Sequence, residues 1–243
     1  MIVEFQPNPA STCDRECAPE ARFLEPEDIP ELLALERAKW NALQAASAVA
    51  LAERIAAHPG LCVGAFCRET GAVLASLFMQ PVAPDFWRHS TSWQDCISQP
   101  APGTTASLFG ISLSSREPAA VDALMAFFWP YALKGGWREI ILGSPIPGLR
   151  DWLIRHPGTD RRVADYVHMR RGRLPLDPQL RYYHARGFRH IVCIKPGYFP
   201  HAPSLDHGVI LRGAVPLSLL YPMWRALPLA QVQRVTRRCE RLL

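Results

Sequence analysis

The stretch that decides the fold runs from Ser107 to Gly143 and reads SLFGISLSSREPAAVDALMAFFWPYALKGGWREIILG. Its first seven residues, 107–113, are mostly apolar and predict a buried strand. A helix is expected over 118–133, where an apolar pattern at helical spacing continues until Gly135-Gly136 stops it. A second strand follows over 139–143. Together the three elements predict a β-α-β unit, whose two strands run parallel.

The residues before this unit predict two helices and three strands. Glu25-Pro26-Glu27-Asp28 is an acidic helix opening, and apolar residues on one helical face follow it. The irregular segment Gln80–Thr105 is expected to be a surface flap rather than a core element. The other expected elements are a strand over 22–24, a helix over 45–57, and an antiparallel hairpin of strands over 61–67 and 72–78.

The residues after the unit begin with a basic, irregular span over 150–173. A helix is expected to open at Asp177-Pro178 and to end at Gly187. Strands are expected over 190–194 and 209–211. The end of the chain, 217–243, predicts one or two helices that point four arginines outward: Arg234, Arg237, Arg238 and Arg241.

Composition excludes several classes of protein. The 243 residues are 49% hydrophobic and 20% charged, which excludes a disordered chain and fits one elaborated domain. The longest apolar stretch, 118–133, contains Asp122 and falls short of the roughly 20 residues that a membrane span needs. Cys13 and Cys17 lack a matching Cys/His couple, so we expect free thiols, no metal and a reducing cytoplasm. The net charge of +5 suits an anionic ligand or an acidic partner.

Three stretches carry a resemblance to a known family. They are Leu108–Leu113, Leu142–Gly148, and Leu176–Phe188, the last continued by Pro196–Pro200 and Gly208–Leu211. On these residues the chain resembles the GNAT superfamily of acyltransferases, in particular a branch with hydrolase-associated and polyketide-loading members. The resemblance implies an α/β (α+β) fold: a mixed, mostly antiparallel sheet with splayed central strands, flanked by helices. It covers 21–212, between an irregular lead-in over 1–20 and a helical extension over 213–243.

The resemblance also implies a site and a donor. Splayed strands receive the pantetheine arm of an acyl thioester, an acceptor attacks it directly, and Tyr183 protonates the departing sulfur. The alternative for Tyr183 is an aromatic residue packed on a helix. Relatives that decarboxylate malonyl thioesters carry histidine at this position and arginine where this chain has Phe199, so decarboxylation is not expected. The residues expected to bind the donor are Ile111, Ser112, Leu113, Arg116, Ala119, Ala120, Val121 and Ser144.

The expected phosphate-binding turn departs from the family pattern. Glycines normally stand in this turn because backbone must approach phosphate closely, yet here it reads Arg116-Glu117-Pro118-Ala119-Ala120-Val121. The same residues also suit a helix start, with capping-box spacing between Ser114 and Glu117. The donor is therefore either acyl-CoA or the phosphopantetheine thioester of an acidic carrier protein. A GNAT-fold binding module without catalysis is the third alternative.

Other side chains are candidates for the acceptor side. Trp93 and His168 are expected to contact the substrate, which is a small molecule or a carrier protein. An aromatic plug that holds the flap is the alternative for Trp93 and its neighbour Trp87. Neither nucleic acid nor a membrane is expected as a partner. Packing of the tail on the domain, or on a second copy in a homodimer, is expected from Leu229, Val232, Val235 and Leu242. No glutamate stands on the 107–113 strand, so the base is sought among His89, Asp95, Asp165, His168 and His184.

Overall fold

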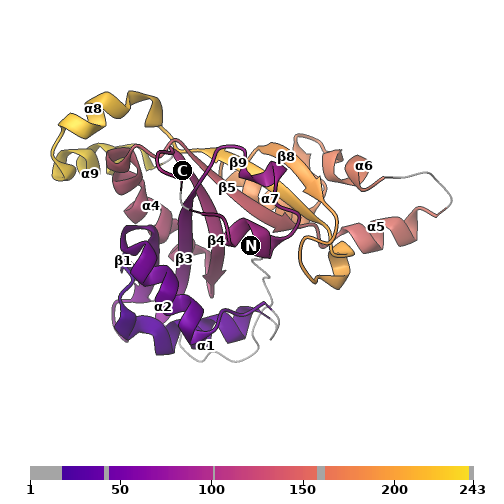
Figure 1. The fold of residues 1–243 in the computed structure, drawn as a ribbon, viewed down its shortest axis with the longest axis horizontal. Helices are drawn as coiled ribbons and strands as arrows, with labels where there is room; N and C mark the ends of the chain where they lie inside the picture. The colour runs from indigo at the N-terminus through magenta and orange to yellow at the C-terminus, as the bar shows by residue number, and fades with distance from the viewer. Residues whose placement is uncertain (1–17, 41–43, 101, 158–161, 241–243) are drawn as a thin grey trace.

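The computed structural model describes residues 18–40, 44–100, 102–157 and 162–240 (Figure 1). Within these residues a mixed sheet of seven strands has the order β1-β2-β3-β4-β5-β9-β8. Neighbouring strands are antiparallel except β4 and β5, which are parallel, so the predicted class and sheet are confirmed. The strands are β1 (Pro19–Phe23), β2 (Cys62–Cys67), β3 (Val73–Val82), β4 (Ser107–Ser115), β5 (Glu139–Pro145), β8 (His190–Lys195) and β9 (Gly208–Ala214), and a separate hairpin pairs β6 (Arg170–Arg171) with β7 (Leu174–Pro175).

Helices cover both faces of the sheet. Side chains of α1, α2 and α3 pack with one face, while those of α4 to α9 pack with the other. Each face therefore has its own apolar cluster, as expected for a three-layer domain. The helices are α1 (Ile29–Lys39), α2 (Ala48–Ala57), α3 (Trp93–Ile97), α4 (Pro118–Gly135), α5 (Leu149–Arg155), α6 (Val163–His168), α7 (Pro178–Ala185), α8 (Tyr221–Ala226) and α9 (Leu229–Arg238), with short 3-10 turns at Pro26–Asp28, Pro59–Leu61, Phe86–Arg88, Ala202–Ser204 and Ser218–Leu220.

The central strands β4 and β5 pair over only half of their length. Their register runs from Ser107 opposite Glu139 to Gly110 opposite Leu142 and stops there. β4 has a bulge at the same place. Phe78 of β3 pairs with Ser112 and its neighbour Met79 pairs with Gly110, so Ile111 has no partner residue on β3. A bulge bends its strand and increases the local twist. Beyond it, β4 continues to Ser115 and β5 to Pro145 without pairing to each other. The splayed strands are thus confirmed.

Two sequence expectations about irregular segments are wrong. The segment predicted as a surface flap buries Phe86 and Cys96 below 3% exposure in the cluster under α1 and α2, and Ser90 is also buried. The basic span over 150–173 contains α5 and α6, because Trp152 and Tyr166 anchor these short helices in the other cluster. In both segments a few aromatic side chains outweigh a polar local composition.

The end of the chain folds onto the domain. The predicted helices are present as α8 and α9, and both pack against α4. Trp224 and Val232 are buried at this contact, while Arg234, Arg237 and Arg238 point outward as expected. Arg241 and Leu242 lie outside the described residues. The helical extension is therefore packed on the domain along one side of α4 (Figure 1).

The predictions about free thiols and about a membrane span can be tested on the residues that the structure describes. Cys62, Cys96, Cys193 and Cys239 are free thiols, and Cys67 is disulfide-bonded, so the cysteines alone do not establish a reducing compartment. Cys13 and Cys17 lie outside the described residues. Of the helices that the structure describes, none is both long enough and apolar enough to pass through a bilayer.

Candidate functional site

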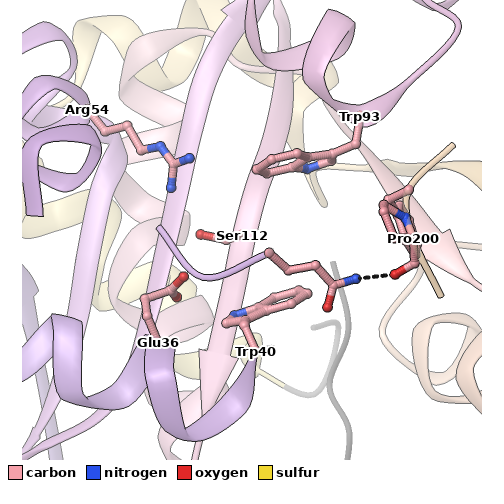
Figure 2. Close-up of a pocket in the computed structure, with 8 residues that line it drawn as sticks. Glu36, Trp40, Arg54, Trp93, Ser112 and Pro200 are labelled. Atoms are coloured by element: carbon pink, nitrogen blue, oxygen red, sulfur yellow. Dashed lines mark hydrogen bonds between the residues drawn. The ribbon is translucent and has the colours of Figure 1, made fainter. Parts of the chain in front are cut away.

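A cavity of about 60 Å³ lies beside the splayed part of β4, on the face covered by α1 and α2 (Figure 2). Its walls come from segments far apart in the sequence: two helices, the segment before β4, β4 itself and the loop before β9. The residues that give it its chemistry are Glu36, Trp40, Arg54, Trp93, Ser112 and Phe199. The cavity thus adjoins the place where the β4–β5 ladder opens.

Glu36 brings a carboxyl group into this cavity from α1. The side chain is 1% exposed, and the Ser114 hydroxyl donates a hydrogen bond to its Oε1. The backbone N–H of Ala46 donates to Oε2 at 3.2 Å. Burial raises the pKa of Glu36, while these hydrogen bonds and the charge of Arg54 oppose the rise. Glu36 was not among the predicted site residues.

The Ser114 hydroxyl connects α1 to β4. Besides its bond to Glu36, it accepts a 2.6 Å hydrogen bond from the indole N–H of Trp40. The predicted capping box between Ser114 and Glu117 is therefore wrong, since Ser114 is engaged on the other face of the sheet. Instead, the hydroxyl of Ser115 accepts from the backbone N–H of Glu117, which is the N-cap residue of α4.

Two polar atoms in the cavity wall are buried without a hydrogen-bond partner. One is Nη1 of Arg54 on α2, and the other is Oγ of Ser112 on β4. Burial lowers the pKa of Arg54 and the charge of Glu36 opposes this, yet the ion pairs among the described residues do not include one between these two side chains. Unpaired buried donors cost free energy, so they indicate a place where a ligand or water supplies the missing partner.

Aromatic rings enclose the polar groups. Figure 2 shows the Trp93 and Trp40 rings on opposite sides of the cavity. The Trp93 indole N–H donates a 3.1 Å hydrogen bond to the carbonyl of Ile111, the bulged residue of β4. Trp93 is thus in the cavity wall, where the sequence expected a substrate contact. The predicted alternative, an aromatic plug, is equally compatible with this hydrogen bond.

Four of the eight predicted donor-binding residues lie on the strands beside the opening, in one group on β4 and one on β5. Ile111, Ser112 and Leu113 lie together on the part of β4 that no longer pairs with β5. Ile111 faces the cluster under α1 and α2, whereas Leu113 faces the cluster under α4. Ser144 lies on the part of β5 that no longer pairs with β4, is fully buried and donates its hydroxyl hydrogen bond to the carbonyl of Pro145. The two groups line the opening from its two sides.

The turn between β4 and α4 contains the residues expected to meet phosphate. Arg116 and Ala119 are exposed, but the side chains of Ala120 and Val121 are buried in the core. A side-chain role toward phosphate is therefore excluded for Ala120 and Val121. Glu117 is half-buried, and its Oε1 is shielded from solvent with no hydrogen-bond partner. The start of α4 thus carries a partly buried carboxylate in the turn for which the sequence predicted phosphate binding.

Tyr183 lies on α7 in the cluster under α4, not in the cavity. Its side chain is 1% exposed, and its ring packs edge-on against Tyr182 and Phe188. Burial raises its pKa far above the ordinary value of 10.0, and a hydrogen bond with Gln179 opposes the rise only in part. The phenol therefore stays protonated at neutral pH, as a hydrogen-bond donor rather than a strong acid.

None of the predicted base candidates lines the cavity. Asp95 and Asp165 accept hydrogen bonds at the starts of α3 and α6, and hydrogen bonds from Thr91 and Ser92 lower the pKa of Asp95. His89 and His168 are exposed, and His184 is half-exposed on α7. His168 is thus not brought to the site as a substrate contact. Within the described residues, no three His, Cys, Asp or Glu side chains gather as metal ligands.

No protein-family model and no curated protein matches the chain. Several solved structures are similar to it in fold. The chain is similar to the GphF GNAT-like decarboxylase in complex with isobutyryl-CoA, with 25% identity, a TM-score of 0.66, and coverage of 81% of this chain and 99% of that one. It is also similar to the loading GNATL domain of CurA from Lyngbya majuscula, with 18% identity, a TM-score of 0.68, and 81% and 98% coverage. A third neighbour is yncA from Salmonella typhimurium with its cofactor acetyl-CoA, with 11% identity, a TM-score of 0.50, and 82% and 95% coverage.

Proposed function

The chain has the fold of the GNAT superfamily, and on this premise we propose that it transfers an acyl group from a pantetheine thioester to an amine held in the cavity beside β4. The observation that carries this proposal is the opening between β4 and β5 beyond Gly110 and Leu142. Beyond this point the edges of β4 and β5 that face each other do not pair, so their backbone groups are available to the two amides of pantetheine. A neighbour with the same fold holds isobutyryl-CoA, which supports a thioester as the donor.

Positioning supplies most of the catalysis in this mechanism. The thioester carbonyl lies at the mouth of the opening, and the acceptor nitrogen attacks it from the cavity. The Ile111 carbonyl accepts one hydrogen bond from the Trp93 indole N–H and keeps a second lone pair for an amide N–H of the donor. The bond from carbonyl carbon to sulfur then breaks, and the thiolate takes a proton.

We propose that the phenol of Tyr183 donates a hydrogen bond to the sulfur atom that leaves the thioester. Its phenol keeps its proton at neutral pH because burial raises its pKa. It stabilises the thiolate as a hydrogen-bond donor, and the proton that converts the thiolate to a thiol comes from the attacking amine. This role requires the thioester to displace part of the packing around the ring, since the side chain is 1% exposed without a ligand.

The donor is either acyl-CoA or the phosphopantetheine thioester of a carrier protein. Arg116 is exposed at the turn, and Lys39 lies close enough that burial and the charge of Arg116 both lower the pKa of Lys39. Two cations favour a phosphate at this place, whereas Glu117 opposes the second phosphate of a diphosphate. We therefore expect the carrier-bound arm, with its single phosphate, to be tolerated at least as well as CoA.

Titration calorimetry with acetyl-CoA, acetyl-pantetheine and an acetylated carrier protein tests these statements. Arg116→Gln should weaken acetyl-CoA binding by about tenfold and leave acetyl-pantetheine unchanged, because only the former carries phosphate. The matched control is Arg150→Gln, which changes an exposed arginine on α5. Absence of thioester binding in every titration would instead support the binding module without catalysis.

Decarboxylation is a second candidate, because the 25% identical neighbour is a decarboxylase. Incubation with malonyl-CoA, followed by mass spectrometry, distinguishes the two reactions. The proposed transferase leaves malonyl-CoA intact when no acceptor is present. Formation of acetyl-CoA under those conditions would make the chain a decarboxylase.

A further inference from the structure

The cavity beside β4 carries opposite charges on its wall. Glu36 reaches it from α1 and Arg54 from α2, and Figure 2 shows Ser112 between them on β4. We propose that this cavity binds a small α-amino acid as the acyl acceptor, with the ammonium group on Glu36 and the carboxylate on Arg54 and Ser112. The inference rests on the proposed acyl transfer and adds the class of acceptor to it.

Arg54 and Ser112 supply the side that binds the carboxylate. Nη1 of Arg54 and Oγ of Ser112 are both buried and without a hydrogen-bond partner, and Ser112 is only 4% exposed. Both groups donate hydrogen bonds, and a guanidinium group matches a carboxylate in charge and geometry. A ligand carboxylate in this position would satisfy both atoms at once.

Glu36 supplies the side that binds the ammonium group. Each of its two oxygens accepts one hydrogen bond from the protein, so each keeps acceptor capacity for an N–H of the ligand. The indole rings of Trp40 and Trp93 flank the same space, and aromatic faces attract cations. These groups together favour a cation near Glu36.

The size of the cavity limits the ligand. Its volume of about 60 Å³ accepts about four water-sized groups, at roughly 15 Å³ for each. Glycine, with five non-hydrogen atoms, is slightly larger than that and alanine is larger again, so any longer side chain would have to leave through the mouth. The cavity therefore fits the backbone atoms of an amino acid with a small side chain.

The chemical step balances with groups that are already named. The ammonium group first gives one proton to Glu36, and the free amine nitrogen then attacks the thioester carbonyl carbon. A C–N bond forms, the C–S bond breaks, and the second amine proton leaves for the thiolate. Glu36 returns its proton to solvent, so the products are an N-acyl amino acid, a thiol and one proton.

An acyl group that carries its own carboxylate is the competing occupant of Arg54. Such a group would bring a negative charge into the cavity without a cation for Glu36, and the two carboxylates would repel each other. The amino acid is favoured because it satisfies both charges. A dicarboxylate ligand is therefore the comparison that the experiment has to contain.

Tryptophan fluorescence titrations of the full chain test the inference, because Trp40 and Trp93 line the cavity. The ligands are alanine, alanine methyl ester, propionate and malonate. We expect alanine to bind at least about tenfold more tightly than the ester or propionate, each of which lacks one charge. Stronger binding of malonate than of alanine, or no binding of alanine, would overturn the inference.

Variants assign each charge to its residue. Arg54→Met should reduce the affinity for alanine to that of the methyl ester and leave the ester unchanged, while the isosteric Glu36→Gln should reduce it to that of propionate. Arg37→Met is the control, since Arg37 is exposed on α1 outside the cavity. An equal loss for alanine and its ester in Arg54→Met would contradict the assigned contact.

Binding of acetyl-CoA, measured separately, distinguishes this inference from the proposed function. If acetyl-CoA binds and alanine does not, the acceptor assignment is wrong while acyl transfer from a thioester stands. If alanine binds in the expected pattern and no thioester does, the amino-acid site stands and the transfer is wrong.

Discussion

Glu36 holds a carboxyl group in an environment with almost no water, and burial raises its pKa above the ordinary value of 4.5. The native chain therefore keeps this proton to a higher pH than the unfolded chain does. As the pH rises from about 4.5 through the folded pKa, the unfolded chain loses the proton first. The contribution of Glu36 to the free energy of unfolding is thus full below pH 4.5 and is lost across that range.

Glu36→Gln removes this dependence, because the amide is neutral at every pH. We expect the stability of the variant relative to the natural chain to increase as the pH rises from 4.5 to 7. Urea unfolding at four or five pH values in this range measures it. Glu53→Gln, an exposed change on α2, should show no such trend. A natural chain that gains stability relative to Glu36→Gln over the same range would show that Arg54 outweighs burial.

Tyr183→Phe tests the proposed donor to the sulfur. The change removes one oxygen from a buried ring, so we expect the fold to be kept and kcat for acyl transfer to fall about a hundredfold. The steady-state rate with a thioester donor measures it, and Tyr182→Phe is the matched control. Unchanged turnover in Tyr183→Phe would remove its assigned role and leave a packing function.

The residue that the sequence should have indicated is Glu36. It follows Leu32 and Leu35 at the spacing of one helical face, and both leucines are fully buried. A carboxylate on such a face is unusual and marks a candidate site. Its hydroxyl partner, Ser114, lies 78 positions away in the sequence, so no local pattern could predict the contact. Tyr183 was found through the resemblance, but its burial depends on packing between distant segments.

At the scale of elements, Asp177 fixes the helix that carries Tyr183. Its Oδ1 accepts hydrogen bonds from the backbone N–H groups of Gln179 and Leu180 at the start of α7. Its Oδ2 accepts from the Tyr166 hydroxyl and from the N–H of Gly148, in the turn after β5. One carboxylate therefore joins α7, α6 and the end of β5.

Asp177→Asn keeps one side-chain oxygen to accept the hydrogen bonds at the start of α7. The other oxygen becomes an NH2 group, which donates hydrogen bonds and cannot accept them. Tyr166 and Gly148 would then lose their acceptor. We expect a loss of about 1–3 kcal/mol in the free energy of unfolding, the usual cost of leaving a buried donor unpaired. Urea denaturation measures it, with Asp151→Asn on α5 as the control. A loss below about 0.5 kcal/mol would show that the connection is not structural.

The elements were predictable to different degrees for physical reasons. The β4-α4-β5 unit was predicted because its apolar periods are long and Gly136, with a φ of 78°, ends the helix. The bulge at Ile111 was not predicted, because an apolar residue at this position fits a regular strand equally well. The helices α5 and α6 were missed since each is short and is held by one or two aromatic residues.

At the scale of the whole molecule, α8 and α9 extend the core that α4 begins. Trp224 is 2% exposed and donates a 2.7 Å hydrogen bond to the carbonyl of Leu217. Trp224→Ala should lower the free energy of unfolding by about 3–5 kcal/mol, as for other buried aromatic truncations. Far-ultraviolet circular dichroism during urea unfolding measures it. A separate early transition with an unchanged main one would instead make the extension an independent unit.

The proposed acyl transfer requires that pantetheine occupies the opening between β4 and β5. An NMR titration of the nitrogen-15-labelled chain with an unreactive thioether analogue of acetyl-pantetheine tests it most directly. If pantetheine binds there, we expect the largest amide shifts on Ile111, Ser112 and Leu113 of β4 and on Gly143 and Ser144 of β5. Saturable binding that shifts amides elsewhere and leaves these five unchanged would contradict it.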